Sequence, residues 1–252
     1  MTLRCAVREC KQIMEGMIFA AGLGTRLRPL TNDRPKAMVT LAGKPLLEHV
    51  IVKMRNAGIG RIVVNGHHFA DQIEDFLRNR PELARDVVVS DERDCLLDTG
   101  GGLWKAADLF TPGEAVLIHN VDILADIDLQ AVMRFHQQYR NFATLVVRPA
   151  VPGRGLRFDA DGVLKGWENS LTGEQKVVDE GFRDARSYSF CGVHIVSPEF
   201  LQHFVHRGAF SIIDEYLAQA KSHALKMYLH EGDFMDLGTP EAIAEAEQGM
   251  RG

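Results

Sequence analysis

The chain has 252 residues, enough for one substantial α/β domain or two small ones. Its apolar fraction of 46% and charged fraction of 25% are those of an ordinary soluble globular protein, and no stretch resembles a membrane span or a secretory signal. The net charge of −5 argues against a nucleic-acid or anionic-membrane surface, so any anionic ligand needs a local cluster of cations. Cys5, Cys10, Cys95 and Cys191 lack the spacing of a zinc site or a disulfide framework, and we expect a cytoplasmic protein.

The start of the chain divides into a polar segment and a buried strand. Residues 1–15 are polar, of mixed charge and without a clear period, and we interpret them as an N-terminal extension, added or arising from a mis-assigned start. Met17 to Ala21 is a short apolar run of the kind that forms a buried parallel strand. The folded domain is therefore expected to begin at about residue 16.

The loop after this strand suits a polyphosphate. Gly22, Gly24 and Thr25 follow the strand, and their backbone N–H groups can face a phosphate without a Cβ in the way. Three arginines and a lysine come within the next dozen residues, among them Arg26 and Lys36. A Gly-x-Gly pair is also common in tight turns, and this one belongs to neither a Walker A motif nor a dinucleotide fingerprint.

Strands and helices then alternate up to about residue 150. Strands are predicted at 61–65, 87–90, 115–118 and 144–147. Helices are predicted at 46–54, 69–78 and 129–139, with another beginning at Asp98. This alternation indicates an α/β fold with a doubly wound parallel sheet, in which ligands bind at the carboxyl ends of the strands.

Beyond Pro152 the pattern changes to short strands separated by Gly and Asp turns. The predicted strands, 156–158, 163–167 and 188–196, suggest a small antiparallel insertion. Helices at 198–205, 212–220 and 240–248, the last capped by Thr239, and a strand at 226–229 complete the chain. We interpret this half as a lid that covers and selects the substrate within a single domain.

Two carboxylates stand out from the remaining acidic residues. Asp122 follows the strand at 115–118, where a doubly wound sheet can place a metal ligand. Asp126 and Asp128 are interpreted as a solvated loop and a helix cap. Asp236 could be an acid at a helix N-terminus, but Thr239 is better placed to cap that helix. Only the fold can bring Asp122 and Asp236 together.

A glycine run and a polar strand end provide further candidates. Thr99 is followed by three glycines that open a helix, and this run is too rich in glycine to favour helix stability. Its backbone could lie against a flat base and its amides could contact the base edge, or the run could be a helix cap with a hinge. Asn65 ends the strand at 61–65 beside His67 and His68, which we interpret as residues of the nucleotide rim because no third metal ligand is evident.

The string from Ala20 to Thr31, Ala-Ala-Gly-Leu-Gly-Thr-Arg-Leu-Arg-Pro-Leu-Thr, with Pro35-Lys36 after it, closely resembles the signature loop of the sugar-1-phosphate nucleotidyltransferases. The segment from Asp236 to Pro240 also resembles that family's Asp-x-Gly-Thr-Pro. The resemblance covers Met17 to about Glu247. It is closest to short bacterial members such as N-acetylmuramate-1-phosphate uridylyltransferases and mannose- or heptose-1-phosphate guanylyltransferases. It implies the fold of that family, a doubly wound, mostly parallel Rossmann-like sheet with a small antiparallel lid.

The resemblance also implies a reaction. An NTP and a sugar 1-phosphate would give an NDP-sugar and pyrophosphate, for activation or recycling of a cell-envelope sugar. Because the attacking phosphate oxygen is already an anion, catalysis needs positioning and charge neutralisation and no general base. By this resemblance Arg26 and Lys36 are the catalytic cations, and Asp122 and Asp236 hold Mg²⁺.

The remaining site residues are likewise implied by the resemblance. Residues 16–150 would form the nucleotide-binding half and residues 151–252 the sugar-binding half. The sugar would contact Glu168 and Gly192, while Cys191 is interpreted as a packed residue and not a nucleophile. The nucleotide would contact Ala21, Gly22, Gly24, Thr25, Asn65, Thr99, Gly100 and Gly101.

The chain departs from the family in two places. Val121 stands where the family usually has a glycine before the metal-binding aspartate, and Asn169 stands where many relatives carry a lysine that contacts the sugar phosphate. We therefore expect another cation to point into the pocket beside Glu168 and Gly192. The candidates, of which the first two are preferred, are Arg148, Arg154, Arg157, Lys165 and Lys176.

Two other functions remain open. A cytidylyltransferase for a non-sugar phosphate such as phosphocholine would use the same nucleotide half. A non-catalytic nucleotide-binding homologue would normally have lost one of the two catalytic cations or one of the two aspartates. This chain has all four of them: Arg26, Lys36, Asp122 and Asp236. No nucleic-acid or membrane partner is expected, and the sequence leaves a homo-oligomer open.

Overall fold

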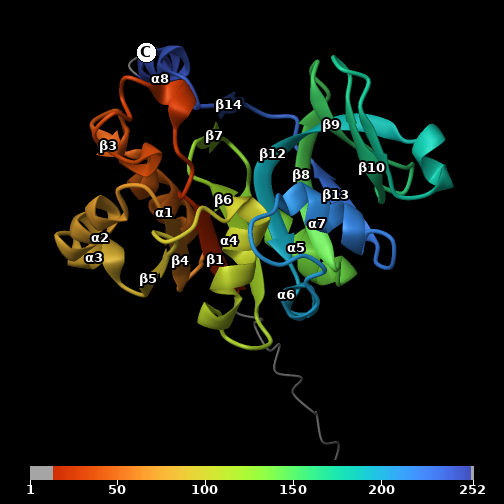
Figure 1. Ribbon diagram of the computed structural model, residues 1–252, viewed down its shortest axis with the longest axis horizontal. Helices are drawn as coiled ribbons and strands as arrows, with labels where there is room; N and C mark the ends of the chain where they lie inside the picture. Colours follow the sequence, from red (N-terminus) through yellow and green to blue (C-terminus); the bar gives the residue numbers. More distant parts are fainter. Residues whose placement is uncertain (1–13, 251–252) are drawn as a thin grey trace, which may run out of the picture.

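The computed structural model describes residues 14–250, which fold around a ten-stranded sheet (Figure 1). The strands of this sheet are β1 (Met14–Phe19), β4 (Ile62–Gly66), β5 (Val87–Asp91), β6 (Ala115–Asn120), β8 (Ala143–Pro149), β9 (Arg154–Phe158), β10 (Leu164–Asn169), β11 (Gln175–Val177), β12 (Arg186–Val196) and β13 (Leu225–Leu229). The helices are α1 (Leu46–Asn56), α2 (Ala70–Arg78), α3 (Pro81–Ala84), α4 (Asp98–Ala106), α5 (Leu129–Tyr139), α6 (Pro198–Gln202), α7 (Ile212–Gln219) and α8 (Pro240–Gly249).

The first half of the chain forms the parallel part of the sheet. β5, β4, β1 and β6 are neighbours in that order, with Met17 opposite Val63 on one side and Ile118 on the other. Since the strands are parallel, their carboxyl ends lie along one edge. The segments that follow β1, β4 and β6 therefore meet there, as the alternation of elements predicted.

Helices cover both faces of this sheet, because successive side chains of a strand point to opposite faces. Ile18 and Leu117 belong to a core formed with α1, α5 and α8. Met17 and Ile118 belong to a second core formed with α4, α6 and α7. The doubly wound architecture predicted from the sequence is confirmed.

β12 takes a different place from the one predicted. The sequence assigned residues 188–196 to the antiparallel insertion and put β8 next in the parallel sheet. Instead, the end of β12 is inserted between β6 and β8, antiparallel to both, while its beginning pairs with β9. The register to β8 shifts between Phe190 and His194, and Gly192 there has a φ of 68°. A long strand that bends at a glycine can thus belong to both parts of the sheet.

The lid is the antiparallel extension formed by β9, β10 and β11, on the far side of β12 from α1 and α2 (Figure 1). A second small sheet pairs β7 (Ile123–Ala125) with β14 (Phe234–Asp236). Two very short strands, β2 (Thr40–Leu41) and β3 (Lys44–Pro45), form a hairpin before α1. β2, β3, β7, β11, β14 and α3 were not predicted from the sequence.

The first strand begins earlier than predicted. Met14 and Glu15, assigned to the N-terminal extension, belong to β1 and are buried. Glu15 escaped detection because it is charged, yet its carboxylate accepts hydrogen bonds from the backbone N–H of Thr111 at 2.9 Å and from its hydroxyl at 2.7 Å. The rest of that extension, residues 1–13, lies outside the described residues. Within residues 14–250, no helix is long and apolar enough to cross a membrane.

Candidate active site

Two adjoining cavities lie along the edge where β1, β4 and β6 end. The first has a volume of about 330 Å³ and is lined by the loop after β1 and the beginning of α4. The second, of about 730 Å³, lies between that loop, β14 and the lid. Lys36, Asn120 and Asp122 line both cavities. A ligand in one cavity can therefore meet a ligand in the other at these three side chains.

The loop after β1 is held in a fixed shape. Gly24 has a left-handed φ of 61°, and its carbonyl accepts a hydrogen bond from the Thr31 hydroxyl at 2.8 Å. A Cβ at Gly24 would lie 2.9 Å from the Thr31 side chain, so only glycine fits there without a shift. Ala21 and Gly22 line the first cavity, while Thr25 begins a short 3₁₀ helix outside both cavities.

Asn65 holds this loop through its side chain. Its carbonyl oxygen accepts hydrogen bonds from the backbone N–H of Ala20 at 2.7 Å and of Ala21 at 3.3 Å. Its amide group donates to Glu92 Oε1 at 2.8 Å, so the orientation of Asn65 depends on Glu92. Asn65 also lines the first cavity, where it was predicted to contact the nucleotide.

Glu92 supports the site through Asn65, and the sequence did not reveal this role. Its side chain is fully buried, one carboxylate oxygen has no hydrogen-bond partner among the described residues, and burial raises the pKa of the carboxyl group. In the sequence it stands in the run Asp91-Glu92-Arg93-Asp94, which has the composition of a solvated turn. No periodicity distinguishes the one buried member of such a run.

The two predicted metal ligands are brought together by the small β7–β14 sheet. Asp236 pairs across it with Ile123, the residue after Asp122. The backbone N–H of Leu237 donates to the carbonyl of Asp122 at 2.8 Å, which fastens the two segments at this point. Both aspartates line the second cavity.

Each aspartate lies beside one predicted catalytic cation. Lys36 Nζ contacts Asp122, and both side chains are largely buried. Arg26 Nη2 lies 3.5 Å from Asp236 Oδ2, in a more exposed position. The fold therefore gathers all four residues around the second cavity. Val121, the residue before Asp122, is buried in the core.

This donor set is compatible with Mg²⁺. Carboxylate oxygens are the protein ligands Mg²⁺ prefers, and it usually takes one or two of them together with waters and substrate phosphates. Residues 14–250 contain no group of three or more His, Cys, Asp or Glu side chains arranged to hold a metal. Asp122 and Asp236 thus fit a metal that shares its coordination with a phosphate.

The first two glycines at the start of α4 do not have free backbone N–H groups, although these groups were expected to be able to contact a base. The backbone N–H groups of Gly100 and Gly101 both donate to the carbonyl of Phe210, at 2.9 and 3.2 Å. A Cβ on Gly100 would lie 2.4 Å from the Phe210 ring, and one on Gly101 would lie 2.1 Å from the carbonyl oxygen of Gly208. These two glycines allow close packing against residues 208–210, which the sequence could not place beside them. Thr99 does line the first cavity.

Glu168 is also turned away from the expected position. Its carboxylate pairs with Arg157 Nη1 at 2.9 Å and does not line the second cavity. Its neighbour Trp167 does line that cavity, because adjacent residues of a strand face opposite sides. Gly192 also lines the cavity.

The five candidate cations divide into two groups. Arg157, Lys165 and Lys176 form ion pairs with Glu168, with Asp159 and Asp179, and with Asp214. Arg148 and Arg154, the preferred candidates, line the second cavity beside Gly192. Cys191 lies near Arg148 but is buried, and burial raises the pKa of its thiol to about 12, which makes it inert as a nucleophile.

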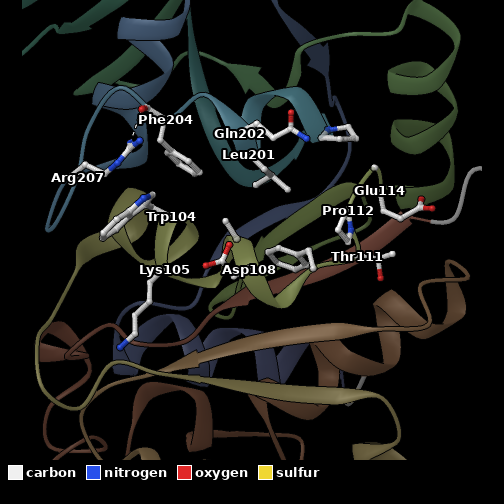
Figure 2. Close-up of a pocket in the computed structure, with 14 residues that line it drawn as sticks. Trp104, Lys105, Asp108, Thr111, Pro112, Glu114, Leu201, Gln202, Phe204 and Arg207 are labelled. Atoms are coloured by element: carbon white, nitrogen blue, oxygen red, sulfur yellow. Dashed lines mark hydrogen bonds between the residues drawn. The ribbon is translucent and has the colours of Figure 1, made fainter.

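A further cavity of about 690 Å³ lies at the opposite edge of the sheet, before β6 (Figure 2). Trp104 and Arg207 face each other at one side of it, with the guanidinium 5.7 Å from the ring centroid. Arg207 also donates to the carbonyls of Phe204 and His206, and Lys105 donates to that of Asp91. Since its cations are engaged within the protein and no predicted site residue reaches it, this cavity is not the candidate site.

Comparison with known proteins identifies relatives of this chain. The family profile described as nucleotidyl transferase matches residues 15–155. The chain is 35% identical over 237 residues to the N-acetylmuramate alpha-1-phosphate uridylyltransferase of Caulobacter vibrioides, covering 92% of this chain and 94% of the relative. It is 29% identical to the enzyme of the same name from Neisseria meningitidis, covering 93% and 97% of the two chains. Its fold is similar to that of HddC from Yersinia pseudotuberculosis in complex with GMP-PN, with a TM-score of 0.75, 22% identity, and coverage of 94% and 99%.

Proposed function

The chain belongs to the nucleotidyl transferase family and is a sugar-1-phosphate nucleotidyltransferase, and on that premise we propose that it joins UTP and N-acetylmuramate 1-phosphate to give the UDP-sugar and pyrophosphate. The observation that carries this proposal is the meeting of Asp122 and Asp236 at a cavity that adjoins the loop after β1. The choice of base and sugar rests on the two relatives of that activity, each of which the chain matches over almost its whole length. Activation or recycling of a cell-envelope sugar is the role we infer.

The nucleotide would lie in the first cavity and the sugar phosphate in the second. The loop from Ala21 to Gly24 would face the phosphates of UTP with its backbone N–H groups. A sugar-phosphate oxygen would then attack the α-phosphorus near Lys36, and pyrophosphate would leave from the opposite side. Arg26 and Lys36 would neutralise the charge that builds up on the transferring phosphate.

Asp122 and Asp236 would hold Mg²⁺, which when bound supplies positive charge to the phosphate oxygens and helps to orient them. In the protein alone, each carboxylate lies beside a cation, Asp122 beside Lys36 and Asp236 beside Arg26. These cations would be free to turn toward substrate phosphates once the carboxylates are neutralised by a metal. The same four side chains would then serve both the metal and the phosphates.

A pyrophosphate-release screen tests the proposal. UTP, GTP, CTP and ATP are each combined with N-acetylmuramate, mannose, heptose and glucose 1-phosphates and with phosphocholine, with Mg²⁺ present. The proposal predicts the highest kcat/KM for UTP with N-acetylmuramate 1-phosphate. Preference for GTP with mannose or heptose 1-phosphate would change the base and sugar, and preference for CTP with phosphocholine would replace the sugar. Nucleotide binding without turnover of any pair would indicate a non-catalytic homologue.

A further inference from the structure

The second cavity contains two arginines that no acidic side chain neutralises. Four cations line it, and two of them lie beside its two aspartates, Lys36 beside Asp122 and Arg26 beside Asp236. The others are Arg148 and Arg154, and neither forms an ion pair with any of residues 14–250. The cavity therefore has a local excess of positive charge in a protein whose net charge is −5.

Arg148 is fixed in place and still has a donor to offer. Its guanidinium lies over the ring of Phe234, with 4.6 Å between Cζ and the ring centroid, and Phe234 belongs to the same strand as Asp236. Its Nε is buried without a hydrogen-bond partner among the described residues. A buried donor that lacks a partner is unfavourable, so an acceptor from a ligand would stabilise this arrangement.

Arg154 reaches the cavity from the lid. It stands at the start of β9 directly opposite Asn169 of β10, and the next pair on the same face is Leu156 with Trp167. Arg154, Leu156 and Trp167 all line the cavity, which shows that this face of the lid is turned toward it. Side chains at opposite positions of an antiparallel pair are neighbours, so residue 169 could present a charge to the same region.

Resting on the proposed function, we infer that Arg148 and Arg154 form the binding site for the phosphate of the acceptor substrate, with Arg148 as its fixed member and Arg154 as its member on the lid. Paired arginines suit a phosphate, since their N–H groups match its oxygens and retain their charge. The position of Arg154 on the lid would connect binding of the acceptor to the placement of β9 and β10 over it. Neither arginine would contact the nucleotide, which occupies the other cavity.

Steady-state kinetics of single variants test this assignment. Arg154→Ala and Arg148→Ala should each raise KM for the acceptor about tenfold or more, the effect of losing a hydrogen bond to a charged group, while KM for the NTP changes less than twofold. Arg154→Lys should lie between Arg154→Ala and the parent. Arg183→Ala is the matched control, because Arg183 is an exposed residue between β11 and β12, outside the cavity, and it should change neither KM.

A charge moved across the strand pair provides a sharper test. In the Arg154→Ala background, Asn169→Lys should lower KM for the acceptor again, because it places a cation opposite the missing one. The melting temperature of each variant shows whether it is folded. An unchanged KM for the acceptor in folded Arg154→Ala and Arg148→Ala would overturn the assignment while leaving the proposed function intact. If the folded double variant Arg154→Ala/Asn169→Lys showed no recovery toward the KM of the parent, the assignment of Arg154 would be overturned.

Calorimetry with inorganic phosphate separates this inference from the proposed function. Should the parent protein turn over no substrate pair, the proposed function fails, but phosphate binding can still be compared among the parent, the two alanine variants and Arg183→Ala. The assignment predicts that phosphate binds about tenfold more weakly to Arg148→Ala and Arg154→Ala than to Arg183→Ala. Equal affinities in all four proteins would contradict it.

Discussion

The most informative single substitution is Gly101→Ala at the beginning of α4. From the sequence, this glycine was expected to lie against the base of the nucleotide. In the structure it packs instead against the segment before α7, and an added Cβ would lie 2.1 Å from the carbonyl oxygen of Gly208 and 3.0 Å from the Leu97 side chain. The substitution should therefore weaken the fold before it affects the affinity for nucleotide.

The magnitude follows from three contributions. Forcing a methyl group into a packed site costs about 1–3 kcal/mol. Displacing residues 208–210 also strains the hydrogen bonds from Gly100 and Gly101 to Phe210, each of which contributes about 0.5–1.5 kcal/mol. The better helix propensity of alanine returns about 1 kcal/mol. The free energy of unfolding should fall by about 3 kcal/mol, which lowers the melting temperature by about 6–12 °C in a protein of this size.

Gly22→Ala is the matched control for this experiment. No atom outside its immediate neighbours lies within 4 Å of a Cβ built on Gly22, so the melting temperature should stay within about 2 °C of the parent. Differential scanning calorimetry on both variants, with UTP titrations on the folded protein, measures the two effects separately. A melting temperature of Gly101→Ala equal to that of the parent, together with lost UTP affinity in this variant, would refute the packing role and restore contact with the base.

Three further predictions concern catalysis and acid stability. Asp122→Asn, and likewise Asp236→Asn, should abolish turnover while leaving the fold intact; turnover within tenfold of the parent at saturating Mg²⁺ would remove that residue from the metal site. Arg26→Ala should lower kcat far more than it weakens NTP binding, if Arg26 acts mainly on the transition state, whereas a raised KM with unchanged kcat would make it a binding residue only. Burial lowers the pKa of His136 to about 4, so the stability that its neutral form contributes is fully present above pH 6.5 and is lost as the pH falls toward 4. In urea unfolding, His136→Gln should lose less free energy of unfolding than the parent between pH 6.5 and pH 4, by up to about 3 kcal/mol. The same pH dependence in the variant and the parent would contradict this role of His136.

The parts of the fold that the sequence predicted are those with a regular pattern. Continuous apolar runs identified β1, β4 and β6 because strands covered on both faces need them. Parallel alternation then placed the loop after β1, Asn65 and Asp122 at one edge of the sheet. That these three features lie at one edge could be predicted without knowing any individual contact between them.

The parts that the sequence missed depend on contacts between distant segments. The pairing of β7 with β14 joins strands of three residues each, too short to show a period, and it is what brings Asp236 to Asp122. Gly100 and Gly101 were misinterpreted because Phe210 could not be placed beside them. The direction of Glu168 depends on the register of β10, where a shift of one residue exchanges the two faces. The cytoplasmic location and a homo-oligomer stay predictions.

The central claim is that a phosphate oxygen of the acceptor attacks the α-phosphorus of the NTP, and isotope labelling tests it most directly. The acceptor is prepared with ¹⁸O in its phosphate oxygens and incubated with unlabelled UTP, Mg²⁺ and the enzyme, and the products are analysed by mass spectrometry. We predict that all of the label appears in the UDP-sugar, including its bridging oxygen, and that an equal amount of unlabelled pyrophosphate is released. Labelled pyrophosphate, or hydrolysis of UTP without a UDP-sugar, would contradict the claim.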